Sequence, residues 1–170
     1  MKNFLCKNFI GCPRVTMSLS LEYRLIGTGW AECIVTTDDK SVKVTASYLS
    51  DALLSLVEAV LSIAQGTKET HASFYEEPGE YRWVFKQQDE GSVCIQIWEF
   101  TDLWSDQPDA SGNLIFEIKC PVSILVRAMI ICLDNILNTY GFEKYKEKWL
   151  EHDFPEASYK ELRKYLGDTP

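Results

Sequence analysis

The sequence predicts a single α+β domain built on a mainly antiparallel sheet of six to seven strands. Three observations indicate this class: apolar residues alternate along several short segments, turn residues separate these segments, and two longer segments have helical periodicity. Connections this short join antiparallel neighbours, because a parallel crossover needs a dozen residues or more. The chain has 170 residues, of which 46% are apolar, so one core needs no metal or disulfide to stabilise it.

The first half of the chain predicts three strands and a helix. Alternation predicts a strand over 19–25, and strands over 30–36 and 41–48 follow after short polar turns. Ser50 is the expected N-cap of a helix of about sixteen residues that ends at Gly66. This half is therefore expected to fold as a meander followed by a long helix.

The second half repeats this order with one more strand. Strands are predicted over 70–76, 80–86, 92–100 and 114–120, and a helix over 123–138 that is apolar nearly all round. We expect both long helices to cover one face of the sheet. The repeated order makes the chain a candidate for a βββα pseudo-duplication.

Two short amphipathic helices are predicted after residue 140. The first has an apolar side within a charged segment, and the second follows a capping-box pattern over Asp153–Glu156. The predicted domain spans residues 17–166.

Residues 1–16 differ in composition from the rest of the chain. They contain three basic residues and no acid, whereas all 25 acids follow. We expect a disordered leader or a start codon assigned too early, with Met17 as the working start. Their apolar run is too short for a secretory signal.

Charge and cysteine usage exclude several functions. The net charge of −8 disfavours nucleic-acid binding, since acidic proteins repel phosphate. The six cysteines have neither CxxC spacing nor a neighbouring histidine, so we expect no zinc site. The spacing of the acids matches no calcium loop, and we expect no metal and no cofactor. Scattered cysteines favour a reducing cytoplasm. The apolar run over 122–133 contains Arg127 and is too short for a membrane span.

Catalytic motifs are missing from the sequence. A P-loop, a dinucleotide fingerprint and a nucleophile elbow are all absent, and the two histidines, His71 and His152, stand apart. This favours a non-enzymatic protein, although enzymatic activity stays open because a Cys–His pair can form in space.

Acidic residues and one tryptophan form the main candidate site. Two turns are rich in acids, and Trp104 lies in one of them, where a tryptophan can anchor a protein partner. The candidate partner-binding residues are Glu76, Glu77, Glu80, Asp102, Trp104, Asp106 and Asp109. Solvated turns, or a Trp104 that folds back onto the core, are the alternative interpretation.

A second candidate site consists of charged residues on the strands. Arg24 and Arg82 are expected on polar faces near acids such as Glu32, and cross-strand ion pairs are their default role. In the alternative, Arg24, Glu32 and Arg82 line a ligand pocket between sheet and helices, as arginine binds carboxylates well.

Two sequence runs carry a resemblance. The run Gly27–Glu32 (GTGWAE) and the later run Glu76–Trp83 (EEPGEYRW) resemble small uncharacterised acidic α+β proteins of bacteria. Some proteins of this style are immunity partners in polymorphic toxin systems, and the likeness covers residues 17–140. It implies an α+β fold and a protein partner.

These observations predict a non-enzymatic cytoplasmic protein that binds a basic protein partner. The more specific prediction is an immunity protein that occludes a basic toxin. The alternative is a small-molecule enzyme or ligand-binding protein with a pocket between sheet and helices. An uncovered apolar sheet face would favour a homodimer.

Overall fold

The computed structural model describes residues 15–89, 91–103, 106–150 and 152–167. It confirms the α+β class, with seven antiparallel strands in two sheets. The first sheet has the order β1 (Leu19–Ile26), β2 (Trp30–Thr37), β3 (Ser41–Ser47). The second has the order β4 (Glu69–Tyr75), β5 (Glu80–Gln87), β6 (Ser92–Phe100), β7 (Asn113–Pro121).

The two sheets lie side by side at β3 and β4 without a shared ladder. Ser47 Oγ donates a hydrogen bond to Tyr75 O at 3.1 Å, and Thr45 Oγ1 donates one to Glu76. The predicted single sheet is therefore divided at the point where a helix separates consecutive strands in the sequence.

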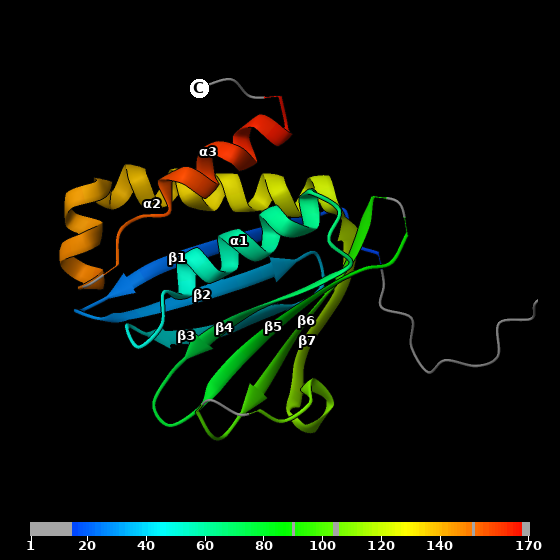
Figure 1. The fold of residues 1–170 in the computed structure, drawn as a ribbon, viewed down its shortest axis with the longest axis horizontal. Coiled ribbons are helices and arrows are strands. Elements are labelled where there is room, and N and C mark those ends of the chain that lie inside the picture. The colour runs from blue at the N-terminus through cyan, green and yellow to red at the C-terminus, as the bar shows by residue number, and fades with distance from the viewer. Residues whose placement is uncertain (1–14, 90, 104–105, 151, 168–170) are drawn as a thin grey trace, which may run out of the picture.

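Three helices complete the fold: α1 (Ala52–Ala64), α2 (Val122–Trp149) and α3 (Glu156–Tyr165). Figure 1 shows both long helices on the same side of the strands, with α3 above them. Helix α1 packs against β4 and β5, and α2 packs against β1 and β7. The core lies between these helices and the inward faces of both sheets.

Alternation decides which side chains enter this core. In β1 the side chains of Leu21, Tyr23 and Leu25 are buried, while the residues between them are exposed. In β5 the rule is broken, because Val84 is buried on the outer face while Trp83 and Phe85 are buried on the inner face. The second sheet is thus covered on both sides around β5.

The N-cap of α1 differs from the prediction. Asp51, not Ser50, caps the helix, because its Oδ1 accepts the Leu54 N–H at 3.2 Å. Ser50 instead contacts β4, where its Oγ lies 3.5 Å from Ser73 O. Helix α1 is correspondingly shorter than predicted, with 13 residues.

Helix α2 contains a kink that the sequence prediction placed between two helices. Gly141 has φ 63° and ψ −178°, and the chain beyond it returns toward the first sheet. There Trp149 packs edge-to-face on Tyr23, with ring centroids 6.3 Å apart. By length and composition α2 would suffice to cross a membrane, and half of its most apolar stretch is buried in this fold.

The capping box predicted at the start of α3 does not form. Pro155 occupies the N-cap position, and no side chain caps the helix. The helix is held instead by its contacts with α1 and α2 and by the ion pair between Arg163 and Asp134, at 2.6 Å.

The residues before β1 run beside β7. Thr16 N donates to Lys119 O at 2.8 Å, and Val15 forms an isolated parallel bridge with the same residue. Both had been assigned to the leader, whose residues 1–14 lie outside the described part. The strand and helix order matches the repeat seen in the sequence, with one extra strand in the second half.

Candidate functional site

One end of the second sheet gathers acidic side chains from two connections. Register pairs Tyr75 with Glu80, Glu80 with Phe100, and Glu99 with Asn113, so the β4–β5 and β6–β7 connections leave from the same end. We call this surface the acidic end; its residues are Glu76, Glu77, Glu99, Asp102 and Asp106. None of them lies within ion-pair distance of a lysine, arginine or histidine in the described part of the chain.

The segments that form this end contain no basic residue of their own, and Arg82, which follows the first of them, pairs with Glu80 and Asp109. Segments 74–81 and 99–109 contain seven acids and no lysine or arginine. Glu77, Asp102 and Asp106 are exposed, while Glu76 and Glu99 are half-buried. Near them, burial and the two glutamates raise the pKa of Tyr81 to about 12. Partial burial likewise raises the pKa of Glu76.

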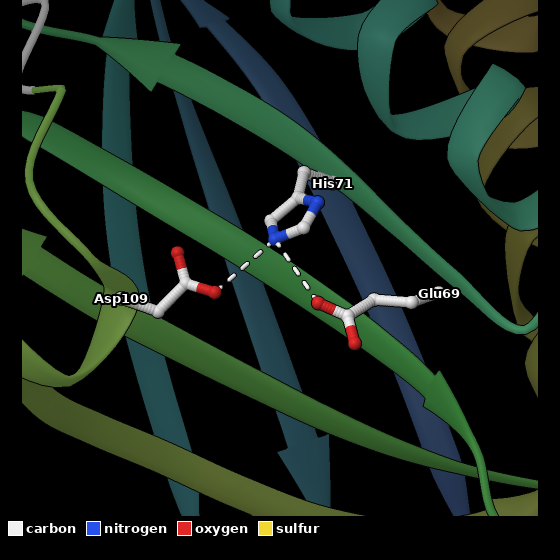
Figure 2. A group of neighbouring side chains, drawn as sticks. All are labelled: Glu69, His71 and Asp109. Carbon is white, nitrogen blue, oxygen red and sulfur yellow. Dashed lines mark hydrogen bonds and ion pairs between the residues drawn. The ribbon is translucent and has the colours of Figure 1, made fainter.

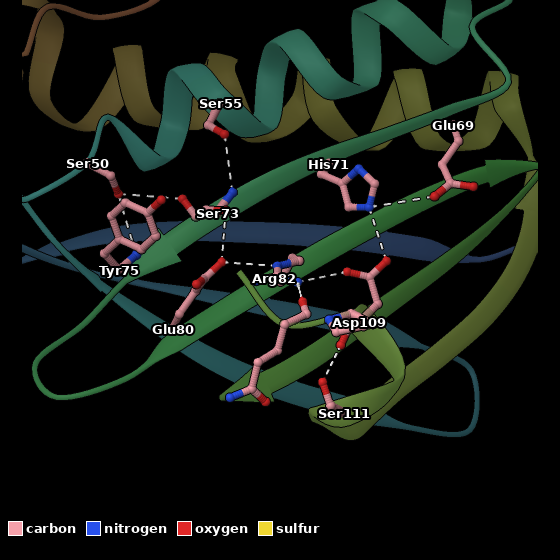
Figure 3. Close-up of polar contacts among 12 residues, drawn as sticks. Ser50, Ser55, Glu69, His71, Ser73, Tyr75, Glu80, Arg82, Asp109 and Ser111 are labelled. Carbon is pink, nitrogen blue, oxygen red and sulfur yellow. Dashed lines mark hydrogen bonds and ion pairs between the residues drawn. The ribbon is translucent and has the colours of Figure 1, made fainter. Parts of the chain in front are cut away.

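The β6–β7 connection then folds back over the outer face of the second sheet. Arg82 on β5 fastens it: Nη1 donates to Gln107 O at 2.9 Å and to Asp109 Oδ1 at 3.0 Å. The guanidinium also lies over the Phe100 ring, 4.3 Å from its centroid. Figure 3 shows Arg82 between Glu80 and Asp109. Arg82 therefore positions the connection that carries Asp102 and Asp106.

Glu80 lies beneath this connection, away from the surface. It is 3% exposed, accepts a hydrogen bond from Ser73 Oγ at 3.0 Å and lies 3.3 Å from Arg82 Nε. Of the predicted partner-binding residues, Glu80 is thus enclosed, and its charge is compensated internally.

Asp109 also faces the sheet. Its Oδ1 pairs with Arg82 and its Oδ2 lies 3.1 Å from His71 Nε2, while Glu69 Oε1 lies 3.7 Å from the same nitrogen (Figure 2). Burial alone would raise the pKa of Asp109, but the hydrogen bonds from Arg82 and His71 outweigh it and hold this pKa below its usual value. The predicted acidic set is therefore divided between the acidic end and this inward-facing network.

The second predicted set does not converge. Arg24 and Glu32 pair across β1 and β2 with 3.7 Å between Nη1 and Oε1, whereas Arg82 belongs to the other sheet. Arg24 also pairs with Glu22 at 2.5 Å, and Lys43 with Glu32 at 3.4 Å. The pairs of Glu32 with Arg24 and Lys43 are the cross-strand ion pairs expected by default, while Glu22 and Arg24 pair within β1.

A groove nevertheless lies beside Arg24. It has a volume of about 590 Å³ and runs between β1 and α2, lined on the strand by Glu22 and Arg24 and on the helix by Asn135 and Asn138. Neither Glu32 nor Arg82 lines it.

Comparisons with known proteins add little. No family model matches this sequence, and no curated protein matches it. Among solved structures, a chain of the CdiA-CT/CdiI toxin and immunity complex from Enterobacter cloacae is similar, with a TM-score of 0.44 and 10% identity over 69% of this chain and 99% of that chain. Similarity at this level carries no functional argument.

One predicted site residue cannot be placed, and two features of the site were not predicted. Trp104 lies outside the described residues. Glu69 and His71 were not singled out, although their spacing of two along a strand places them on one face. The role of Arg82 as the residue that fastens the connection was also missed, because its partners are 25 and 27 positions away.

Proposed function

We propose that this protein binds a basic protein partner through its acidic end. The observation that carries the proposal is the set of five carboxylates at one end of the second sheet, with no basic side chain paired to them in the described residues. Uncompensated carboxylates that share one surface attract a basic protein and accelerate its encounter.

The carboxylates of the acidic end differ from the two predicted acids that form ion pairs within the fold, Glu80 and Asp109. Glu80 and Asp109 share an ion pair with Arg82, whereas no lysine, arginine or histidine pairs with the carboxylates of the acidic end in the described residues. Arg82 holds the β6–β7 connection in place, so Asp102 and Asp106 in that connection would be arranged before a partner arrives. Preorganisation of this kind lowers the cost of binding.

The specific form of this proposal is an immunity protein that occludes a basic toxin. The motif resemblance and the acidic end support it, and no catalytic role is needed for a protein that acts by occlusion.

Site-specific crosslinking in the native host tests the proposal. A photoreactive amino acid replaces Asp102 in one variant and Glu147, an exposed acid on α2, in the control. We expect the Asp102 variant to capture a protein of high isoelectric point at low salt, with capture falling steeply as salt rises. Equal capture from both positions, or captured proteins that are not basic, would overturn the proposal.

Charge neutralisation provides a second, quantitative readout on the captured protein. The pair E77Q and D102N removes two charges from the acidic end, and E143Q with E147Q removes two from an exposed face of α2. We expect only the first pair to slow association, by about 10-fold at low salt. If the captured protein is a toxin, co-expression with this chain restores growth.

A small-molecule ligand is the second candidate function, favoured by the groove between β1 and α2. Its volume of about 590 Å³ is within the range of ligand pockets, and Arg24 at its edge could hold a carboxylate. Titration of wild-type and R24M protein with a library of small carboxylic acids tests it: shifts in NMR peaks of groove residues that are lost in R24M support this function, and their absence removes it.

A further inference from the structure

Three potential metal ligands from distant parts of the chain meet on the outer face of the second sheet. Glu69 and His71 are two residues apart on β4, so both side chains project from the same face of the strand. Asp109 reaches them from the start of η1 (Asp109–Ser111) in the β6–β7 connection. In the part of the chain that the structure describes, no other group of three or more such residues converges in this way.

The ligand atoms are separated by distances that suit a small divalent cation. His71 Nε2 lies 3.1 Å from Asp109 Oδ2 and 3.7 Å from Glu69 Oε1, and one atom from each residue lies within 4.8 Å of the others. Tetrahedral zinc, with ligands at about 2.0–2.2 Å, keeps its ligand atoms about 3.3 Å apart. The separations between the three ligand atoms lie around this value, so small movements of the side chains would bring all three atoms to zinc-ligand distance.

Arg82 orients one of the three potential ligands by a hydrogen bond, as residues next to metal ligands commonly do. Arg82 occupies Asp109 Oδ1 and so leaves Oδ2 directed at His71. Hydrogen bonding that orients a ligand in this way raises metal affinity. Figure 2 shows both carboxylates directed at the same imidazole nitrogen.

Charge balance also suits a divalent ion. A dication with two carboxylates and a neutral imidazole sums to zero, while Arg82 is balanced by Glu80. The other nearby cation is Lys86, whose Nζ lies 3.9 Å from Glu69 Oε2 on a 39% exposed side chain that can turn to solvent. Imidazole with carboxylates favours zinc and similar transition metals over calcium and magnesium, which prefer oxygen ligands alone.

We propose that Glu69, His71 and Asp109 bind one divalent transition-metal ion of the zinc class, with water at the remaining position. The bound ion joins β4 to the β6–β7 connection and thereby provides a second attachment for that connection beside Arg82. The expectation of no metal rested on the cysteine pattern and on acid spacings that match no calcium loop, whereas this set combines a histidine with carboxylates from distant parts of the chain. The proposal is independent of the basic partner and stands or falls by metal binding alone.

Calorimetric titration of the metal-free full chain with Zn²⁺ tests the proposal. We compare wild type with H71A and E69Q, whose altered side chains are exposed and leave the core intact. H152A is the matched control, because His152 is the other histidine and contacts Tyr48 O and Asp51 instead. Circular dichroism confirms that each variant is folded.

We expect one Zn²⁺ per chain in wild type and H152A, and affinity lower by at least about 10- to 100-fold in H71A and E69Q. Zn²⁺ should raise the melting temperature of wild type and H152A but not of H71A. Absence of binding at about 100 µM Zn²⁺ would overturn the proposal. So would equal affinity in H71A and wild type, or a sulfur-to-metal charge-transfer band with Co²⁺, which would assign the ion to cysteines.

Discussion

Replacing Arg82 by methionine is expected to destabilise the fold by about 3–5 kcal/mol. Arg82 is 12% exposed, and its guanidinium compensates Glu80, which is 3% exposed. Methionine replaces the unbranched apolar stem of arginine but lacks the guanidinium, and it leaves Glu80 as a buried carboxylate that retains the hydrogen bond from Ser73. The loss of one partner from a buried ion pair has this magnitude because the remaining charge is not solvated.

Replacing the exposed Arg24 by methionine is the matched control, because it also removes an arginine that pairs with a glutamate. Arg24 also pairs with a glutamate two residues away, at 2.5 Å from Glu22, but its side chain is 52% exposed. R24M is therefore expected to cost much less than R82M, because an exposed ion pair contributes little to stability. Urea unfolding followed by tryptophan fluorescence measures both, since Trp83 and Trp149 are buried.

A double-mutant cycle then locates the cause. If the uncompensated Glu80 is responsible, E80Q in the R82M background recovers stability, with a coupling energy of about 1–3 kcal/mol. The reasoning is refuted if R82M and R24M cost the same within about 0.5 kcal/mol, or if E80Q and R82M are additive.

Further predictions concern the cap, a close contact and pH. D51A should cost about 0.5–2 kcal/mol and S50A less, by thermal unfolding, because Asp51 caps α1; the reverse order would restore Ser50 as the cap. G79A should cost about 1–3 kcal/mol, because a Cβ there would lie 2.4 Å from Phe100 O; a neutral result would mean that the backbone moves freely. The lowered pKa of Asp109 means that its contribution is present above the ordinary aspartate pKa of about 4 and is lost as pH falls below it, since the unfolded chain then binds the proton more tightly. D109N should therefore flatten the acid limb of the stability curve, and an unchanged slope would contradict this origin.

The strands could be predicted because alternation and short turns act locally. β6 begins and ends at the predicted residues, and β1 buries the predicted face. The division into two sheets could not be predicted, because α1 separates β3 from β4 and no local pattern decides whether such strands share a ladder. Asp51 and Ser50 are adjacent and both suit an N-cap, so the sequence did not distinguish them.

For the candidate site, the sequence shows where the acids lie along the chain but not what they contact. The sequence shows which charges are adjacent along the chain, and it therefore shows two connections that are rich in acids. It could not show that Arg82 reaches Asp109 and neutralises Glu80, because these contacts depend on how the connection folds. Acidic residues of these two turns therefore differ in their surroundings, since Glu80 is buried against Arg82 while Glu77 and Asp102 are exposed.

The turn at Gly141 gives the segment that follows it an architectural role. Beyond this glycine the backbone doubles back, Lys148 O accepts the Gly29 N–H at 2.8 Å, and the indole of Trp149 shields Tyr23. The segment after Gly141 thus packs against the turn between β1 and β2 and covers the end of this hairpin. A protein cut short at residue 140 would keep every strand of both sheets yet lose this closure, and an aromatic ring of the interior would be left facing water.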